Sequence, residues 1–344
     1  MSDSKTAKRK KDHINLCLNE DVTFKSKANG FENYEFEHYA ITEVEFDKID
    51  LRTKFFSKDI SYPILISSMT GGSKESEKIN ERLAIVANKL NIPLGVGSQR
   101  QALENKKYLS TYKIMRKYCG NAPLFGNLGA AQIANSKNLK DEIKFLIEII
   151  EADAMVIHLN PLQEILQKEG EINFKGLLKN IEQVVKISNI PIIVKEVGCG
   201  ISKTVAKKLL DIGVKGIDVA GAGGTNWAAV ELLRNNESSI FRDWGLPTSY
   251  CVRTVNELRK NYNFLLISSG GISNGLEIAK SIALGADIVG IARLILKSIV
   301  KSVDITLELI NLWINELKTV MYLTGAQNIK QLKKVKLIKK SELF

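Results

Sequence analysis

Residues 268–293 read SSGGISNGLEIAKSIALGADIVGIAR, and the order of features in this stretch describes much of the chain. The end of an apolar strand is followed by a Gly-Gly turn, an amphipathic helix with an alanine-rich face, another glycine and a second apolar strand. Residues 200–221 repeat this order, with GIS at 200–202 matching GIS at 271–273. Either a repeated unit or the general needs of a βαβ turn can account for the similarity. Both interpretations indicate strand–helix–strand units with a parallel sheet.

Outward from this stretch, eight apolar segments alternate with helical patterns. The expected strands cover 63–68, 92–96, 123–128, 154–159, 191–197, 216–220, 264–269 and 287–292. Amphipathic helices are expected between them, for example at 74–90, 139–150, 202–212 and 274–284. Eight such units in about 240 residues match a TIM (β/α)8 barrel. A doubly wound sheet stays the second possibility, because a sequence pattern does not show closure.

The expected barrel leaves a segment at each end. Residues 1–60 are predicted to form an N-terminal extension packed on the barrel or on a neighbour, and 61–325 the barrel itself. Residues 326–344 are predicted to form a basic, solvated and flexible C-terminal tail. The connection 221–248 is long enough to suggest a functional role.

Composition narrows the class of protein. The chain has 344 residues with 44% hydrophobic residues, which is enough for a substantial core and excludes a disordered chain. Four cysteines without CxxC spacing, no signal-peptide pattern and no long uncharged apolar segment predict a cytoplasmic protein with no membrane span. The net charge of +11 is compatible with nucleic acid, an acidic membrane or an anionic small substrate, and part of it lies in AKRKK at 7–11 and KKVKLIKK at 333–340.

Polar or glycine residues follow every expected strand, where barrel enzymes place their active sites. These segments include SMTGG at 68–72, GSQR at 97–100, GNLG at 126–129, HLNPLQE at 158–164, KE at 195–196, GAGGTNW at 221–227, GG at 270–271 and AR at 292–293. Glycine turns after the last two strands suit a phosphate group, although glycine also serves ordinary tight turns. This coincidence of polar groups at one end of apolar strands predicts an enzyme.

Several single residues at this end could carry chemistry. Lys195 ends a buried strand, where an unpaired ammonium would be costly, and its alternative is an ion pair with Glu196. His158 is an acid–base candidate, or a structural histidine. Glu164 alone cannot hold zinc, but Mg²⁺ uses one or two carboxylates together with substrate phosphates. Trp227 is either a core residue or a site residue that shares a helix face with the residue four positions on, Glu231.

Nine motifs in order along the chain closely resemble type 2 isopentenyl-diphosphate isomerase. They are RKKDHI (9–14), SSMTGG (67–72), GSQR (97–100), GNLGA (126–130), HLNPLQE (158–164), KEVGCGIS (195–202), AGAGGTNWAAVE (220–231), DWGLPT (243–248) and the stretch 268–293. The resemblance implies an FMN-dependent TIM barrel that interconverts isopentenyl and dimethylallyl diphosphate by a 1,3-proton shift. Reduced FMN would act as acid and base, Mg²⁺ would bind the diphosphate, and NADPH would serve only to reduce the flavin.

The resemblance also implies roles for individual residues. Flavin contacts are expected from Ser68, Met69, Thr70, Ser98, Asn127, Lys195 and Thr225, and flavin phosphate contacts from Gly271, Ile272, Ser273, Ala292 and Arg293. Substrate contacts are expected from Arg9, Lys10, Ser98, Gln99, Arg100 and Gln163, with Glu164 on Mg²⁺. The residues expected near the reacting carbons are His158, Gln163, Trp227 and Glu231. Ser273 departs from relatives, which often carry Arg after GGI, so one side-chain contact to the phosphate is lost.

These roles agree with simple chemistry. A diphosphate carries two to three negative charges, so the basic residues at 9–10 and Arg100 are complementary to it. Protonation of an unactivated alkene needs a strong acid, and no side chain supplies an obvious one. Lys195 would stabilise an anionic reduced flavin, and the Trp227 ring would stabilise positive charge at the tertiary carbon.

Two other functions are weighed against this one. Another FMN-dependent TIM-barrel oxidoreductase, such as a 2-hydroxy-acid oxidase, would need a histidine late in the barrel, whereas the histidines here are His13, His38 and His158. A dehydrogenase with a loop cysteine, Cys199 or Cys251, is harder to exclude. A nucleic-acid-binding protein is disfavoured by the absence of a binding motif and by only 7% aromatic residues. The resemblance suggests a homo-oligomer, a tetramer or octamer, that binds a small diphosphate and neither nucleic acid nor membrane.

Overall fold

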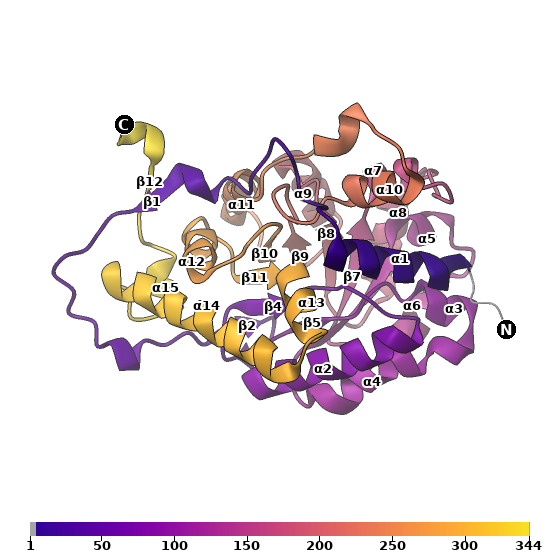
Figure 1. Cartoon of the computed structure of the whole chain (residues 1–344), viewed down its shortest axis with the longest axis horizontal. Helices are drawn as coiled ribbons and strands as arrows, with labels where there is room; N and C mark the ends of the chain where they lie inside the picture. The colour runs from indigo at the N-terminus through magenta and orange to yellow at the C-terminus, as the bar shows by residue number, and fades with distance from the viewer. Residues whose placement is uncertain (1–4, 344) are drawn as a thin grey trace.

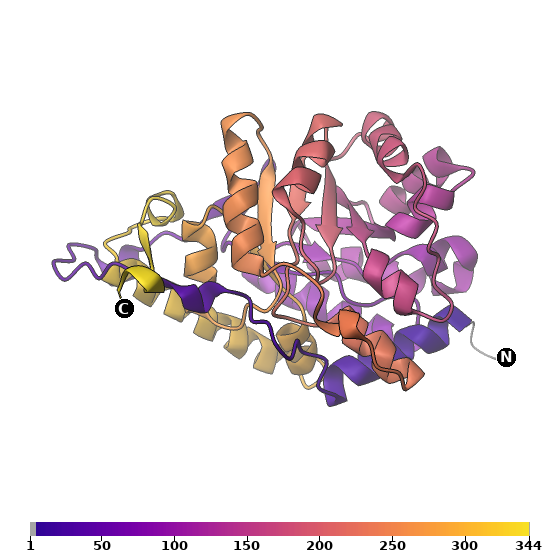
Figure 2. The same cartoon turned by 90° about the horizontal axis from the view of Figure 1, so that it is seen from above.

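The computed structural model describes residues 5–343, apart from the side chains of residues 5–7 and 74. Its centre is a closed barrel of eight parallel strands (Figures 1 and 2). In chain order the strands are β4 (Ile64–Ile66), β5 (Leu94–Gly95), β6 (Leu124–Gly129), β7 (Ala154–Leu159), β8 (Ile192–Glu196), β9 (Gly216–Asp218), β10 (Leu265–Ser269) and β11 (Ile288–Ile291). Pairing of β11 with β4, with Val289 opposite Ile64, closes the ring. The TIM barrel expected from the sequence is confirmed, and the doubly wound sheet is wrong.

Helices surround the barrel because every connection between consecutive barrel strands contains at least one helix. The helices up to the middle of the barrel are α2 (Lys74–Leu90), α3 (Arg100–Glu104), α4 (Ser110–Cys119), α5 (Ala130–Asn135), α6 (Leu139–Glu148), α7 (Pro161–Leu166) and α8 (Leu177–Ile187). The later helices are α9 (Lys203–Asp211), α10 (Trp227–Asn235), α11 (Thr248–Asn256), α12 (Gly275–Ala283), α13 (Arg293–Ile299), α14 (Val303–Leu323) and α15 (Ile329–Leu332). The long connection 221–248 therefore contains α10 and a 3-10 turn, Ile240–Asp243.

Alternation along the strands decides which side chains face the barrel interior. In β8, Ile193 belongs to the inner apolar cluster, whereas its neighbours Ile192 and Val194 belong to the outer layer beneath the helices. Since successive side chains point to opposite faces, Lys195 points inward and Glu196 outward. The register also pairs Lys195 with His158 on one side and with Asp218 on the other. Three polar side chains thus share one level of the barrel.

A short hairpin closes the opposite end of the barrel. Strands β2 (Thr53–Phe55) and β3 (Lys58–Ile60) pair antiparallel, and Phe55 and Ile60 join the inner apolar cluster. The Phe55 ring stacks on Phe125 of β6 with ring centroids 5.6 Å apart. This plug leaves only the carboxyl ends of the strands available for a site.

The N-terminal extension begins with helix α1 (Lys5–Asn19), which contacts α10 and α13. Figure 2 shows α1 on the side to which the strand arrows point. Arg293 fixes the end of α1, because its guanidinium donates to the carbonyls of Cys17 and Glu20 at 2.9 and 2.7 Å. The first segment of the chain therefore lies across the mouth of the barrel.

The C-terminal segment differs from the expected flexible tail. Strand β12 (Leu337–Lys339) pairs antiparallel with β1 (Tyr34–Phe36), as seen at the left of Figure 1. The ammonium of Lys333 binds Asp287, and Lys340 lies 3.4 Å from Glu35. Two lysines of this run are thus paired with carboxylates, which the local charge pattern alone does not reveal. Across residues 5–343, the helices lack the combination of length and apolarity that crossing a bilayer requires.

Candidate active site

A cavity of about 430 Å³ opens at the carboxyl ends of the barrel strands. This volume lies within the range of ordinary small-molecule sites. The structure brings most of the residues predicted from the sequence to its wall. These residues are Arg9, Lys10, Ser68, Met69, Thr70, Ser98, Arg100, Asn127, His158, Gln163, Glu164, Lys195, Thr225, Trp227, Gly271, Ile272, Ser273, Ala292 and Arg293.

Unsatisfied hydroxyl groups mark one side of the cavity. The side-chain oxygens of Ser67, Ser68 and Thr70 are buried and have no hydrogen-bond partner among the described residues. Buried polar atoms in native proteins are nearly always paired. A bound molecule with its own donors and acceptors would complete these groups.

Two glycine turns meet at another side of the cavity. Gly271 has a φ of +80°, and a Cβ atom added to it would lie 2.4 Å from the Gly223 carbonyl oxygen. A Cβ atom on Gly224 would in turn lie 2.5 Å from the backbone nitrogen of Gly271. Only glycine permits this close approach of the two turns. Both turns line the cavity with their backbone.

Lys195 is held by polar groups of the neighbouring strands. Its ammonium lies 3.5 Å from the Asp218 carboxylate and 3.5 Å from the Ser269 hydroxyl, and it donates to the Glu196 carbonyl at 2.8 Å. The carboxylate of Glu196 faces away and accepts from the backbone N–H groups of residues 197–199. The alternative of a Lys195–Glu196 side-chain ion pair is therefore wrong. Asp218, which the sequence analysis missed, is the carboxylate that accompanies Lys195.

His158 is neutral in this environment. Burial, together with the charges of Lys195 and Lys10, lowers the pKa of His158 to about 4. The His158 Nδ1 atom lies 2.7 Å from Asn127 Oδ1, so the proton of the neutral ring is on Nδ1. The ring can accept a hydrogen bond at Nε2, but it does not carry a spare proton at neutral pH.

The basic residues predicted to bind substrate are present but already engaged. The Lys10 ammonium donates to the carbonyls of Gly71 and Ser98 at 2.7 and 2.9 Å. Arg100 forms ion pairs with Glu104 at 2.6 Å and Glu171 at 2.7 Å. An anion that enters here would compete with carboxylates for Arg100.

Glu164 is buried, and its carboxylate accepts hydrogen bonds from neutral groups. Asn160 Nδ2 donates at 2.8 Å and the backbone N–H of Glu171 at 2.8 Å. Nowhere in residues 5–343 do three His, Cys, Asp or Glu side chains gather as a metal site. A metal ion at Glu164 would therefore need most of its ligands from substrate and water.

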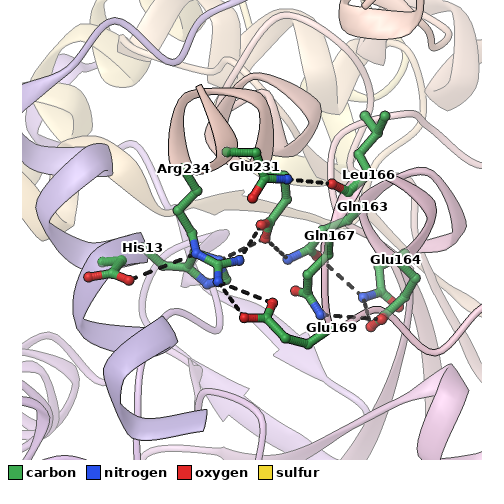
Figure 3. Close-up of polar contacts among 11 residues, drawn as sticks. His13, Gln163, Glu164, Leu166, Gln167, Glu169, Glu231 and Arg234 are labelled. Atoms are coloured by element: carbon green, nitrogen blue, oxygen red, sulfur yellow. Dashed lines mark hydrogen bonds and ion pairs between the residues drawn. The ribbon is translucent and has the colours of Figure 1, made fainter. Parts of the chain in front are cut away.

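Glu231 lies behind the cavity wall and connects several groups (Figure 3). Its Oε1 atom lies 2.8 Å from His13 Nε2 and accepts from Gln163 Nε2 at 3.2 Å. Burial alone would raise the pKa of Glu231, but the hydrogen bond and charge of His13, the Gln163 contact and the Arg234 charge hold this pKa below its ordinary value. The His13 ring also packs edge-on against Trp227, with centroids 5.1 Å apart.

Four predicted contacts involve side chains that other protein groups engage. Gln99 is fully buried away from the cavity wall, where its amide donates to the Leu146 carbonyl and accepts from the Asn127 N–H. Glu231 likewise does not line the cavity, so it reaches the site only through its neighbours. The N–H and hydroxyl of Ser273 both donate to Glu277, and the Arg293 side chain binds the end of α1. In each case protein groups engage the side chain, although Ser273 and Arg293 still line the cavity.

His13 and Arg234 are site residues that the sequence analysis missed. His13 lies four residues after Arg9 on α1, and both side chains line the cavity. The helical i, i+4 spacing within RKKDHI is a signal that could have found His13. Arg234 is related to Glu231 by i, i+3 spacing, but nothing local shows that the pair is buried.

Comparison with known proteins places this site in a family. Residues 3–108 and 152–339 match the model of the FMN-dependent dehydrogenase family. A protein from Nostoc sp. named isopentenyl-diphosphate delta-isomerase is 45% identical, covering 96% of this chain and 96% of that protein. Namesakes from Vibrio parahaemolyticus and Pelodictyon phaeoclathratiforme are 44% and 41% identical, covering 95% and 98% of this chain and 98% and 99% of those proteins. The chain belongs to the isopentenyl-diphosphate delta-isomerase family.

Solved structures with the same fold include enzymes of other activities. A flavocytochrome b2 variant with sulfite bound superposes with a TM-score of 0.72 at 17% identity, over 95% of this chain and 82% of the other. A lactate oxidase structure from Pediococcus acidilactici gives a TM-score of 0.71 at 15% identity, over 98% of this chain and 95% of the other. At such low identity these similarities show the barrel fold alone.

Proposed function

We propose that the chain interconverts isopentenyl diphosphate and dimethylallyl diphosphate by a 1,3-proton shift in the cavity at the barrel mouth. The observation that carries the proposal is the 41–45% identity to isopentenyl-diphosphate delta-isomerases over nearly the whole chain. The cavity supports it, because its wall carries basic side chains together with a neutral histidine and an indole. A substrate with a charged head group and an apolar carbon chain needs both kinds of side chain.

FMN fits the side of the cavity that carries the unsatisfied hydroxyl groups. Ser68 and Thr70 would complete their hydrogen bonds on its ring, with Met69, Ser98, Asn127, Lys195 and Thr225 around it. The glycine turn at residues 270–271 and the backbone at residues 292–293 would hold its phosphate. When reduced, FMN supplies an acid and base strong enough to move a proton to and from carbon. Lys195 would supply a positive charge beside this group. NADPH would be its reductant.

The diphosphate would bind between α1 and the loop after β5. Arg9, Lys10 and Arg100 provide the positive charge, and Ser98 and Gln163 provide hydrogen-bonding groups. Glu164 would contribute one oxygen to Mg²⁺, and the diphosphate and water would contribute the rest. The α1 helix of the N-terminal extension is thus part of the substrate site.

The reacting carbons would lie near His158, Gln163 and Trp227. His158 is neutral and adds no positive charge that would oppose a developing carbocation. The Trp227 ring can stabilise such a charge through its π face. Glu231 orients Gln163 and His13 from behind the wall. We place the protein in the cytoplasm as a homo-oligomer.

The proposal is tested with the reduced FMN-loaded protein, Mg²⁺ and isopentenyl diphosphate under anaerobic conditions, with product followed by proton NMR. Appearance of dimethylallyl diphosphate supports the proposal. The oxidised protein is then incubated with lactate and with mandelate. Oxidation of these hydroxy acids without isomerisation would replace the proposal by the alternative, another FMN-dependent oxidoreductase.

A further inference from the structure

Arg234 connects the three segments that meet behind the active-site wall, as Figure 3 shows. Its Nη1 atom donates to Oε2 of Glu231 at 2.6 Å, within α10. Its Nη2 atom lies 3.0 and 3.1 Å from the two oxygens of Glu169, in the segment between α7 and α8. Its Nε atom lies 3.8 Å from Asp12 of α1. One guanidinium therefore faces three carboxylates from three parts of the chain.

The contact with Glu231 differs in kind from the other two. The Glu231 side chain is fully buried, whereas those of Glu169 and Asp12 are 47% and 40% exposed. A buried carboxylate needs a positive partner and complete hydrogen bonding, whereas an exposed pair contributes little. Arg234 is itself only 12% exposed, so water does not readily replace it.

The two carboxylate oxygens of Glu231 contact different partners. Arg234 occupies Oε2, and Oε1 is left for His13 and Gln163, which both line the cavity. We propose that Arg234 is the positioning residue that holds Glu231 by Oε2 and thereby orients His13 and Gln163 toward the reacting carbons. The inference rests on the proposed function and adds to it a residue outside the cavity.

Two variants distinguish a positioning role of Arg234 from a role in which it only holds the three segments together. Arg234→Met keeps the aliphatic stem and removes every polar contact of the guanidinium. Glu169→Gln weakens only the exposed arm and leaves the Arg234–Glu231 pair in place. We expect Arg234→Met to lower kcat roughly 10- to 100-fold, the loss typical when a group that orients a site residue is removed. Glu169→Gln should change kcat less than about fivefold, since an exposed pair is worth ~1 kcal/mol at most.

Arg234→Lys tests the role of the charge and serves if Arg234→Met does not fold. It restores a cation beside Glu231, so its kcat should lie between those of Arg234→Met and the unchanged enzyme. If Arg234→Met does not fold, the kcat of Arg234→Lys alone decides. A value below that of Glu169→Gln, but at least fivefold above the rate without enzyme, supports the inference. The amount of bound FMN should stay within about threefold in all variants, because the groups proposed to hold it lie elsewhere.

A second readout does not depend on turnover. The chain has three histidines, so their ring signals can be assigned by NMR. Arg234→Met or Arg234→Lys should displace the His13 signal, while Glu169→Gln should leave it in place and His158 should not move in any of them. Absence of activity in the unchanged protein would contradict the proposed function but not this part of the inference. Equal kcat losses in Arg234→Met and Glu169→Gln, or an unmoved His13 signal, would overturn the positioning role.

Discussion

The Nε2 atom of His13 lies 2.8 Å from Oε1 of Glu231, although the two residues are 218 positions apart in the chain. The contact joins the helix that crosses the barrel mouth to the helix after the sixth barrel strand. It buries a carboxylate beside an imidazole directly behind the cavity wall. The N-terminal helix is thereby connected to the groups that would surround the reacting carbons.

The first prediction removes this contact without emptying the space. His13→Phe keeps a ring against Trp227 but has no nitrogen to meet Glu231. A hydrogen bond to a charged group contributes roughly 1.5–3 kcal/mol, so kcat should fall at least about tenfold. FMN content, measured from the visible spectrum, should not change. An unaltered kcat would show that the contact only attaches α1.

The second prediction concerns the diphosphate. Arg9→Ala should raise KM for isopentenyl diphosphate by about 10- to 150-fold, which corresponds to one charge-assisted contact of roughly 1.5–3 kcal/mol. Lys11→Ala is the matched control, because Lys11 is exposed and pairs with Glu75 outside the cavity. Steady-state kinetics of both variants decide the matter. Equal KM values for the two would assign Arg9 to the solvated surface.

The third prediction tests Glu164 as a metal ligand. Glu164→Gln keeps the shape and removes the charge that Mg²⁺ requires. Activity should fall and the Mg²⁺ concentration for half-activation should rise, while FMN stays bound. Glu182→Gln, on the outer helix α8, should give the original Mg²⁺ activation curve. Superimposable curves for all three proteins would remove Glu164 from the metal site.

The fourth prediction follows from the burial of Lys10. Burial, with the charge of Arg9, lowers the pKa of Lys10 from 10.5 to about 7. Its positive charge is present below pH 7 and is lost as the pH rises through 7, so KM for the diphosphate should increase above that pH. Lys10→Met should have a high KM that lacks this rise. A KM that is constant between pH 6 and 9 in the unchanged enzyme would contradict the prediction.

Lys10 should also make the stability of the protein depend on pH: a rise in pH weakens substrate binding but stabilises the fold. Its pKa is lower in the folded chain than in the unfolded chain, so the folded state binds fewer protons between about pH 7 and 10.5. The contribution of Lys10 to the free energy of unfolding therefore increases with pH across this window. Urea unfolding of the unchanged protein and Lys10→Met at pH 7 and pH 9 measures the difference.

The barrel strands could be predicted because they are buried on both faces. Such strands are continuous apolar runs, and all eight were placed within about two residues of their observed ends. The position of the cavity could also be predicted. Polar residues directly after the strands, such as Ser68 and Thr225, come together because parallel strands end on one side of the barrel.

Long-range pairing is what the sequence could not show. Helix α1 is mostly polar, and it is held by contacts such as Lys10 to Gly71 and Arg293 to Cys17 that join distant positions. Gln99 was expected on substrate because it belongs to the GSQR motif of the resemblance, but its side chain satisfies backbone groups. The Arg234–Glu231 pair stands on an ordinary amphipathic helix, and only the tertiary structure buries it.

The ratio of product formed to reductant consumed tests the central claim most directly. The FMN-loaded protein is given one equivalent of NADPH under anaerobic conditions, with excess isopentenyl diphosphate and Mg²⁺. A proton shift involves no net change of redox state, so many molecules of dimethylallyl diphosphate should form for each NADPH oxidised. One NADPH consumed for each product molecule, or no product at all, would contradict the assignment of this chain as an isomerase.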